Sequence, residues 1–327
     1  MAAPEQAVEL VRVVRNDVVE STHTGHVVVC DGDGRTLASL GDPHRSTYVR
    51  SAVKPFQELA VLEILDGAGV TLDLDSMAIA CASHDGSDDQ QIQAARLLAE
   101  ADLDESALLC PAALPRDPDT AWHQRWPYPL AHNCSGKHAS FLLASVTMGA
   151  DPATYLDVDH PLQRMVADAV RDACSTQLSG PGVDGCGAPA WLVPLDALAT
   201  GFARLVAGST PPLQRVRDAM QARPELIGGP GAYDTEFMQA DGRVVAKRGA
   251  EAVFAAGAMV GDRALGIAVK ITDGGHRADG PVTAALLHAL GIATPEPIRR
   301  TPVVGGGVPQ GVLEIDAAVA ALAATLR

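Results

Sequence analysis

Strand-like segments at both ends of the chain constrain its fold most. Residues 7–14 and 26–30 are rich in apolar and β-branched residues, either alternating with polar ones or in a continuous run. The DGDG at 31–34 predicts a hairpin turn into a further strand, TLASL. Near the other end, residues 244–275 predict a strand, a turn and another strand. Because strands joined by hairpins pair antiparallel, we expect the two ends of the chain to build one antiparallel sheet.

The middle of the chain is predicted to be largely helical. One helix is expected in the segment SAVKPFQELAVLEILDGAG, ended by Gly67 and Gly69, and another opens at the capping box Ser87-x-x-Gln90. Further helices are expected at 73–82, 136–148, 160–175, 188–206 and 211–222, with 279–290 and 313–325 near the end. The pattern predicts an α/β (α+β) fold, with an antiparallel sheet from the N- and C-terminal strands and a helical middle lobe.

We expect one two-lobed catalytic domain over residues 1–327. The sheet lobe would take residues 1–70 and 240–327, and the helical lobe residues 71–239. A cleft between two lobes is a usual place for a small-molecule site.

Composition narrows the classes of partner. A net charge of −15 argues against nucleic acid and against an anionic membrane. No apolar run approaches 18 residues, and the N-terminus lacks a basic-then-apolar signal pattern, so we expect a cytoplasmic protein. The six cysteines are scattered without a CxxC pair, which is typical of free, buried thiols.

Lysine is rare in this chain. Of 25 lysine and arginine residues only four are lysines, namely Lys54, Lys137, Lys247 and Lys270, and all lie in turn-rich or polar contexts. Arginine stays protonated in proteins, whereas a desolvated lysine can become neutral. The retained lysines are therefore candidates for chemistry that arginine cannot perform, although Lys247 could simply form an i, i+4 pair with Glu251.

The segment RSAVKPFQ places Ser51 three residues before Lys54. Because Pro55 suits the first turn of a helix, Ser51 should lie at or just before the helix N-terminus, on one face with Lys54. A neutral lysine can take the proton of a serine hydroxyl and make it a nucleophile. Serine–lysine acyl-transfer enzymes add a second serine and a strand lysine, for which Ser83 in CASHDG and Lys270 in VKITDGG are candidates.

Several motifs together resemble the L-asparaginase II family, the serine–lysine (class 3) type. In chain order they are RSAVKPFQ, CASHDG, HNCSGKHA, DGCGAPA, PELIGGPGAYDTEFM, KRGAE and KITDGG. The resemblance runs from about residue 8 to the C-terminus. It implies a fold related to serine β-lactamases and glutaminases, hydrolysis of L-asparagine to L-aspartate and ammonia, and two serine–lysine pairs, Ser51 with Lys54 and Ser83 with Lys270.

The resemblance also implies one zinc ion per chain near the site, held by Cys134, Lys137 and Cys186. Spacing alone would not indicate it, because the cysteines are 52 residues apart and lysine must be neutral to bind a metal. His138 and Asp184 are alternative or supporting groups at this position.

We expect Arg50, His84, Asp85 and Asp184 to bind substrate, with the Arg50 guanidinium suited to a carboxylate. The expected partner is L-asparagine, without nucleic acid or membrane, and the expected assembly is a homodimer. Three alternatives stay open: Ser83 as the nucleophile, a glutaminase or other serine–lysine amidohydrolase, and a non-catalytic zinc-stabilised amino-acid-binding protein.

Overall fold

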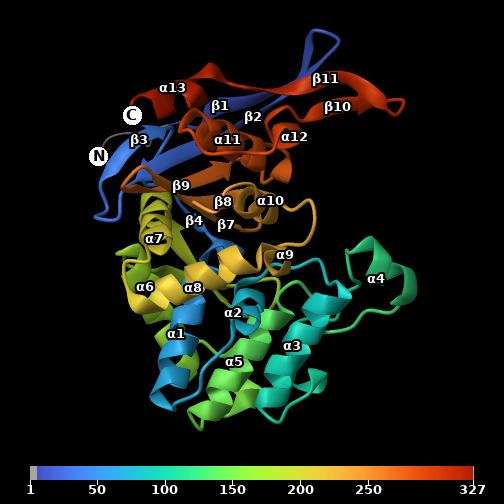
Figure 1. The fold of residues 1–327 in the computed structure, drawn as a ribbon, viewed down its shortest axis with the longest axis vertical. Coiled ribbons are helices and arrows are strands. Elements are labelled where there is room, and N and C mark those ends of the chain that lie inside the picture. Colours follow the sequence, from blue (N-terminus) through green and yellow to red (C-terminus); the bar gives the residue numbers. More distant parts are fainter. Residues whose placement is uncertain (1–5, 327) are drawn as a thin grey trace.

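The computed structural model describes residues 6–326 (Figure 1). Its strands are β1 (Val8–Arg15), β2 (Val18–Cys30), β3 (Thr36–Leu40), β4 (Ser46–Tyr48), β5 (Ser179–Val183), β6 (Pro189–Pro194), β7 (Val244–Arg248), β8 (Val253–Val260), β9 (Arg263–Ile271), β10 (Pro302–Gly305) and β11 (Val308–Ile315).

The main sheet joins the two ends of the chain, as the sequence predicts. Its strand order is β10-β11-β1-β2-β9-β8-β7, with β3 also paired to β2, and every neighbouring pair is antiparallel. The turn between β2 and β3 is the predicted DGDG hairpin. Strand β7 lies at one edge of this order, which matters for the site described below. A second, smaller antiparallel sheet has the order β4-β6-β5.

The α-helices of the described chain are α1 (Lys54–Gly67), α2 (Leu74–Cys81), α3 (Asp88–Glu100), α4 (Pro118–His123), α5 (Ser135–Thr147), α6 (Pro161–Cys174), α7 (Leu195–Ala207), α8 (Pro211–Ala222), α9 (Pro224–Ile227), α10 (Tyr233–Ala240), α11 (His276–Ala289), α12 (Glu296–Arg299) and α13 (Ala317–Ala324). Short 3₁₀ turns are η1 (Arg50–Val53), η2 (Glu105–Ala107) and η3 (Pro152–Thr154).

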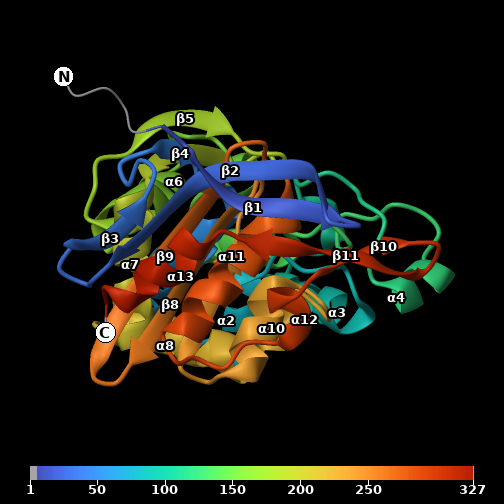
Figure 2. The ribbon, with the colours of Figure 1, turned by 90° about the horizontal axis from the view of Figure 1, so that it is seen from above.

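Helices cover both faces of the main sheet. Helix α7 packs on β2, β8 and β9 from one side, while α11 lies against β8 and β9 from the other, with α13 beside it (Figures 1 and 2). Two glycines let α7 approach closely. A Cβ at Gly266 of β9 would lie 1.7 Å from the Ala199 carbonyl oxygen, and one at Gly257 of β8 would lie 2.3 Å from that of Phe202.

The remaining large helices form a lobe beneath α7. Helix α1 packs against α5, α6 and α8, and α2 packs against α3, α5 and α8 (Figure 1). The predicted capping box is present at the start of α3, where Ser87 and Gln90 bond each other's backbone N–H groups. One apolar core runs from this lobe to the near face of the sheet, and a second fills the space between the sheet and α11. The division into lobes near residues 70 and 240 stays a prediction.

Two predicted helices are partly strands. Residues 189–194, expected to be helical, form β6 because they pair with β4 and β5, and α7 begins only at Leu195. Residues 313–315, expected in the last helix, end β11, which pairs with β1 across the length of the chain. In both places pairing with a strand remote in sequence overrides the local pattern.

The six cysteines are free and buried, as predicted. Within residues 6–326 no helix has the length and apolar character needed to cross a membrane.

Candidate active site

The first serine–lysine pair lies where η1 passes into α1. Lys54 is the first residue of α1 and Pro55 follows it, so the helix begins where the sequence predicts. Ser51 lies within η1, and Arg50 before it has a left-handed backbone (φ 52°), which is uncommon for a residue other than glycine. The Lys54 side chain is buried, with 2% of its surface exposed.

The edge strand β7 brings a different lysine to this turn. Strand β7 packs against η1, and Gly249 just beyond its end permits the approach. A Cβ at Gly249 would lie 2.5 Å from the Val49 carbonyl oxygen and 3.3 Å from the Ala52 nitrogen. The segment Lys247-Arg248-Gly249 therefore runs beside the turn that carries Ser51, with Lys247 fully buried.

Ser83 lies between two lysines. Its Oγ is 3.2 Å from Lys54 Nζ and 2.9 Å from Lys247 Nζ, and 3% of the residue is exposed. Its carbonyl oxygen accepts a hydrogen bond from Arg248 Nη2 at 2.8 Å. A hydroxyl can donate to one amine while it accepts from the other, so this geometry can pass a proton between the two lysines.

The two lysines have unlike surroundings. Lys54 Nζ has three oxygen acceptors, the carbonyls of Ala82 and Asn133 and the hydroxyl of Ser83, which match the three donors of an ammonium group. Burial lowers the pKa of Lys247 to about 7, helped by the cation of Lys54 and opposed by Asp234, whose Oδ2 lies 3.4 Å away. Lys247 is thus the amine that can be neutral near neutral pH.

Asp234 on α10 supports Lys247. It is fully buried, and its Oδ2 also accepts the backbone N–H of Arg248 at 3.2 Å. Although burial alone would raise it, the neighbouring cations of Arg248 and Lys247 hold the pKa of Asp234 below its ordinary value. An ionised carboxylate here keeps Lys247 in place beside Ser83.

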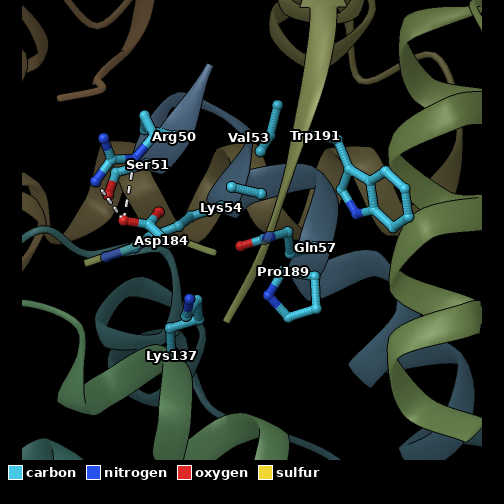
Figure 3. A pocket seen from close by; sticks show the side chains of 10 residues that line it. Arg50, Ser51, Val53, Lys54, Gln57, Lys137, Asp184, Pro189 and Trp191 are labelled. Atoms are coloured by element: carbon cyan, nitrogen blue, oxygen red, sulfur yellow. Dashed lines mark hydrogen bonds and ion pairs between the residues drawn. The ribbon is translucent and has the colours of Figure 1, made fainter. Parts of the chain in front are cut away.

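A pocket opens on Ser51 and Lys54 (Figure 3). The space between its walls is about 290 Å³, a value that includes the open mouth. It is lined by Arg50, Ser51, Val53, Lys54, Gln57, Lys137, Asp184, Pro189, Ala190 and Trp191. The Ser51 hydroxyl makes no hydrogen bond to any residue within 6–326, so it is free to meet a ligand.

One end of the pocket carries an ion pair. Arg50 Nε and Nη2 donate to Asp184 Oδ1 at 3.0 and 2.6 Å, as the dashed lines in Figure 3 show. Burial would raise the pKa of Asp184, but the hydrogen bonds and charge of Arg50 and the charge of Lys137 hold it below its ordinary value. A zwitterion could bind here, with its carboxylate on Arg50 and its ammonium on Asp184.

The cysteine and lysine residues expected to bind zinc do come together. Lys137 Nζ donates to Cys186 Sγ at 3.2 Å, Cys134 Sγ lies 3.7 Å from Asn133 Oδ1, and Cys134, Lys137 and Cys186 are all buried. Interaction between the two thiols lowers the pKa of Cys134 well below the ordinary thiol value, whereas it raises that of Cys186, so the pair holds one thiolate. His138 faces this pair with a buried Nε2 that has no hydrogen-bond partner among the described residues.

Three expected site residues lie elsewhere. Ser83 does not pair with Lys270, whose Nζ instead donates to the Glu251 carbonyl, because Lys270 is on the interior strand β9 rather than the edge. His84 is buried next to Ser83 in the chain. Its Nδ1 accepts the Gly86 N–H at 3.1 Å, and its Nε2 lies 2.9 Å from Ser135 Oγ. His84 is not among the residues that line the pocket. Both residues are corrections to the expected site.

Asp85 also lies outside the pocket. Its side chain packs against Gly229, where a Cβ would lie 2.1 Å from its Oδ2, and its carbonyl oxygen accepts the Asp117 N–H at 3.0 Å. It ties the turn after Ser83 to the segment before α4. Asp85, like His84, is therefore placed to hold the turn that carries Ser83.

Sequence reasoning missed Lys247 as a partner of Ser83 and missed Asp234 and Gln57 altogether. The alternative reading of Lys247 as an i, i+4 partner of Glu251 does not describe it, because its carboxylate neighbour is Asp234 at 3.4 Å. A signal for Lys247 was present, since Lys247-x-Gly249 at the end of a strand provides both an amine and the small residue that lets η1 lie close.

The sequence model of the L-asparaginase II family matches residues 11–312, which is most of the chain. No curated protein matches it. Among solved structures, a putative β-lactamase from Bacteroides dorei DSM 17855 is similar at a TM-score of 0.43 and 11% identity, over 76% of this chain and 85% of that one. That likeness is too loose to carry an argument. Because the family match covers most of the chain, the chain belongs to the L-asparaginase II family of amidohydrolases.

Proposed function

We propose that the protein hydrolyses L-asparagine to L-aspartate and ammonia through an acyl-enzyme on Ser51. The observation that carries this proposal is the unbonded Ser51 hydroxyl in a small pocket that also contains Lys54 and the Arg50–Asp184 ion pair. The α-carboxylate of the substrate would bind Arg50 and its α-ammonium Asp184. Glutamine is longer by one methylene, a difference that a pocket discriminates only weakly, so both amides are tested.

Ser83 and Lys247 supply the base. With Lys247 neutral and Lys54 cationic, Ser83 Oγ can accept a proton from Lys54 while it gives its own to Lys247. Lys54 is then neutral and takes the proton of Ser51 as Ser51 Oγ attacks the amide carbon. When the tetrahedral intermediate collapses, the Lys54 ammonium gives its proton to the amide nitrogen, which leaves as ammonia. Water then attacks the ester as Lys54 takes one of its protons. Lys54 gives that proton to Ser51 Oγ as the ester C–O bond breaks and L-aspartate leaves, and a proton passes back from Lys247 to Lys54 through Ser83.

The test is ammonia release from L-asparagine and from L-glutamine, side by side, by the full chain. We expect turnover of asparagine, weaker turnover of glutamine, and none by the Ser51→Ala variant purified identically. Preference for glutamine would make the protein a glutaminase. Binding of either amino acid without ammonia release would point to a non-catalytic amino-acid-binding protein and would refute the proposal.

Cys134, Lys137 and Cys186 fit a zinc ion beside the pocket. Thiolates are ligands that zinc accepts, and the Lys137 amine, 3.2 Å from Cys186 Sγ, can join them when it is neutral. Within residues 6–326 no group of three or more His, Cys, Asp or Glu residues is placed to hold a metal ion. The expected zinc ligands are two cysteines, Cys134 and Cys186, and one lysine, Lys137, so they would not form such a group. Bound there, zinc would act as a Lewis acid or would hold the pocket wall.

Metal analysis of protein purified without chelator tests this part. We expect about one zinc per chain, lost in Cys134→Ser and in Cys186→Ser, with lower affinity at acid pH because the ligands must be deprotonated. Cys174→Ser is the matched control, since Cys174 is another buried free thiol, away from the pocket. If the protein were fully active without zinc, the zinc site would be refuted, and Cys134 and Cys186 would be ordinary buried thiols.

A further inference from the structure

Gln57 presents a buried amide to the pocket. It lies on α1, three residues beyond Lys54, and 6% of its surface is exposed. Its side-chain amide makes no hydrogen bond with any residue in the described part of the chain, yet it lines the pocket (Figure 3). Its amide is not among the fully enclosed polar groups that lack a partner in the described part of the chain, so it faces the space of the pocket. A ligand bound there can pair with it in place of solvent.

The pocket is divided by polarity. Arg50 and Asp184 form its charged end, whereas Gln57 lies toward Val53, Pro189 and Trp191, which carry no charge (Figure 3). A zwitterionic amino acid held by its head groups at the charged end must direct its side chain away from them. That side chain must still reach Ser51, and Lys54 lies between Ser51 and Gln57 (Figure 3). Gln57 is the uncharged amide on this wall of the pocket that a neutral carboxamide can bond.

We propose that Gln57 is a specificity-determining residue whose Oε1 accepts an N–H of the substrate's side-chain carboxamide. This inference rests on the proposed function. The oxygen end of Gln57 reaches toward the centre of the pocket, as Figure 3 shows. The product carboxylate has no N–H to offer, so the same contact distinguishes substrate from product. Sites built to bond an N–H discriminate strongly against analogues that lack it.

The experiment crosses one variant with two substrates. Gln57→Met keeps an unbranched side chain but removes the amide. L-asparagine is compared with the β-methyl ester of L-aspartate, which forms the same acyl-enzyme but has no N–H on its leaving group. We expect kcat/KM for asparagine to fall about tenfold or more, the scale of one lost hydrogen bond, while the value for the ester changes less than about threefold.

Gln163→Met is the matched control. Gln163 is also buried, but its amide already donates to the Tyr155 carbonyl at 2.8 Å, so its loss should lower the melting temperature without changing the asparagine-to-ester ratio. If Gln57→Met does not fold, Gln57→Leu replaces it.

If kcat/KM fell equally for both substrates, or changed for neither, the role of Gln57 would be refuted. The proposed function would still hold, because it depends on the activity of the wild-type protein. Wild-type protein that releases neither ammonia nor methanol would instead refute the proposed function, and this inference would fall with it.

Discussion

Ser51 and Ser83 share a neighbour, Lys54, but lie in contrasting regions. Ser51 faces an open pocket and its hydroxyl is unbonded, whereas Ser83 is 3% exposed and bonded to an amine on each side. The first hydroxyl is open to a ligand, and the second is enclosed between two amines. The contrast teaches that two serines beside one lysine can differ in access, and under the proposed function this difference separates the nucleophile from the proton path.

Removing each hydroxyl in turn tests this contrast most directly. Ser51→Ala should lower kcat for asparagine by at least about 10⁴-fold, the scale of losing a nucleophile. Ser83→Ala should cost less, about 10²-fold, because it interrupts only the proton path between the lysines. Ammonia release under saturating substrate measures both, with thermal unfolding as the check on folding. The reverse order of effects would make Ser83 the nucleophile.

The next largest effect is expected at the lysines. Lys247→Arg should lower kcat at least about 10²-fold, because a guanidinium cannot become neutral and accept the Ser83 proton. Lys270→Arg is the matched control on the neighbouring part of the sheet, and it should change kcat by no more than about twofold. Near-normal turnover by Lys247→Arg would show that no neutral amine is needed at Ser83.

The pH dependence sharpens the same prediction. The pKa of Lys247 is lowered to about 7, so the active, neutral form gains population as pH rises through that value. Wild-type kcat should therefore rise with pH and level off above it. The observed value belongs to the coupled lysines together rather than to one of them. An activity that is flat between about pH 6 and 8 would contradict this assignment.

The smallest effect on turnover is expected one helical turn below Lys54. Burial raises the pKa of Glu58 to about 8, although Ser140 Oγ donates to its Oε2 at 2.6 Å, and its Oε1 has no partner among the described residues. Between pH 4.5 and 8 the folded state keeps a proton that the unfolded state has lost, so folding stability falls as pH rises through this window.

Glu58→Gln removes that titration. Relative to the wild type, the variant should gain stability progressively from pH 5 to pH 8, by a few kcal/mol at most, with kcat within about twofold. Urea unfolding at the two pH values measures it. A stability difference that does not vary with pH would show that Glu58 stays ionised in the folded protein.

Local signals in the sequence were sufficient for much of this structure. The proline after Lys54, the capping box before α3 and the DGDG hairpin each act over a few residues, and each lies where it was predicted. They also fixed Ser51 at the start of its helix. Features that depend on the order of strands were not predictable in this way.

Lys247 and Lys270 show why. Both lie near the ends of strands followed by glycine, and both strands belong to one run of hairpins. In the assembled sheet β7 is the edge strand beside η1, whereas β9 is an interior strand. Because of this order, the amine of Lys247 reaches Ser83 and that of Lys270 does not. The same holds for β6 and β11, whose partners are β4 and β1, far away along the chain.

The scarcity of lysine has a consequence for the outside of the molecule. Lys54, Lys137 and Lys247 are at most 3% exposed, and Lys270 is partly exposed. Nearly all the positive charge that solvent meets on the described chain is guanidinium. Reagents and ligases that attach groups to lysine amines therefore find a single accessible target while the chain is folded, and three more appear only when it opens. Attachment of more than one group per chain would thus report unfolded molecules, whereas a single group at Lys270 would mark the native surface.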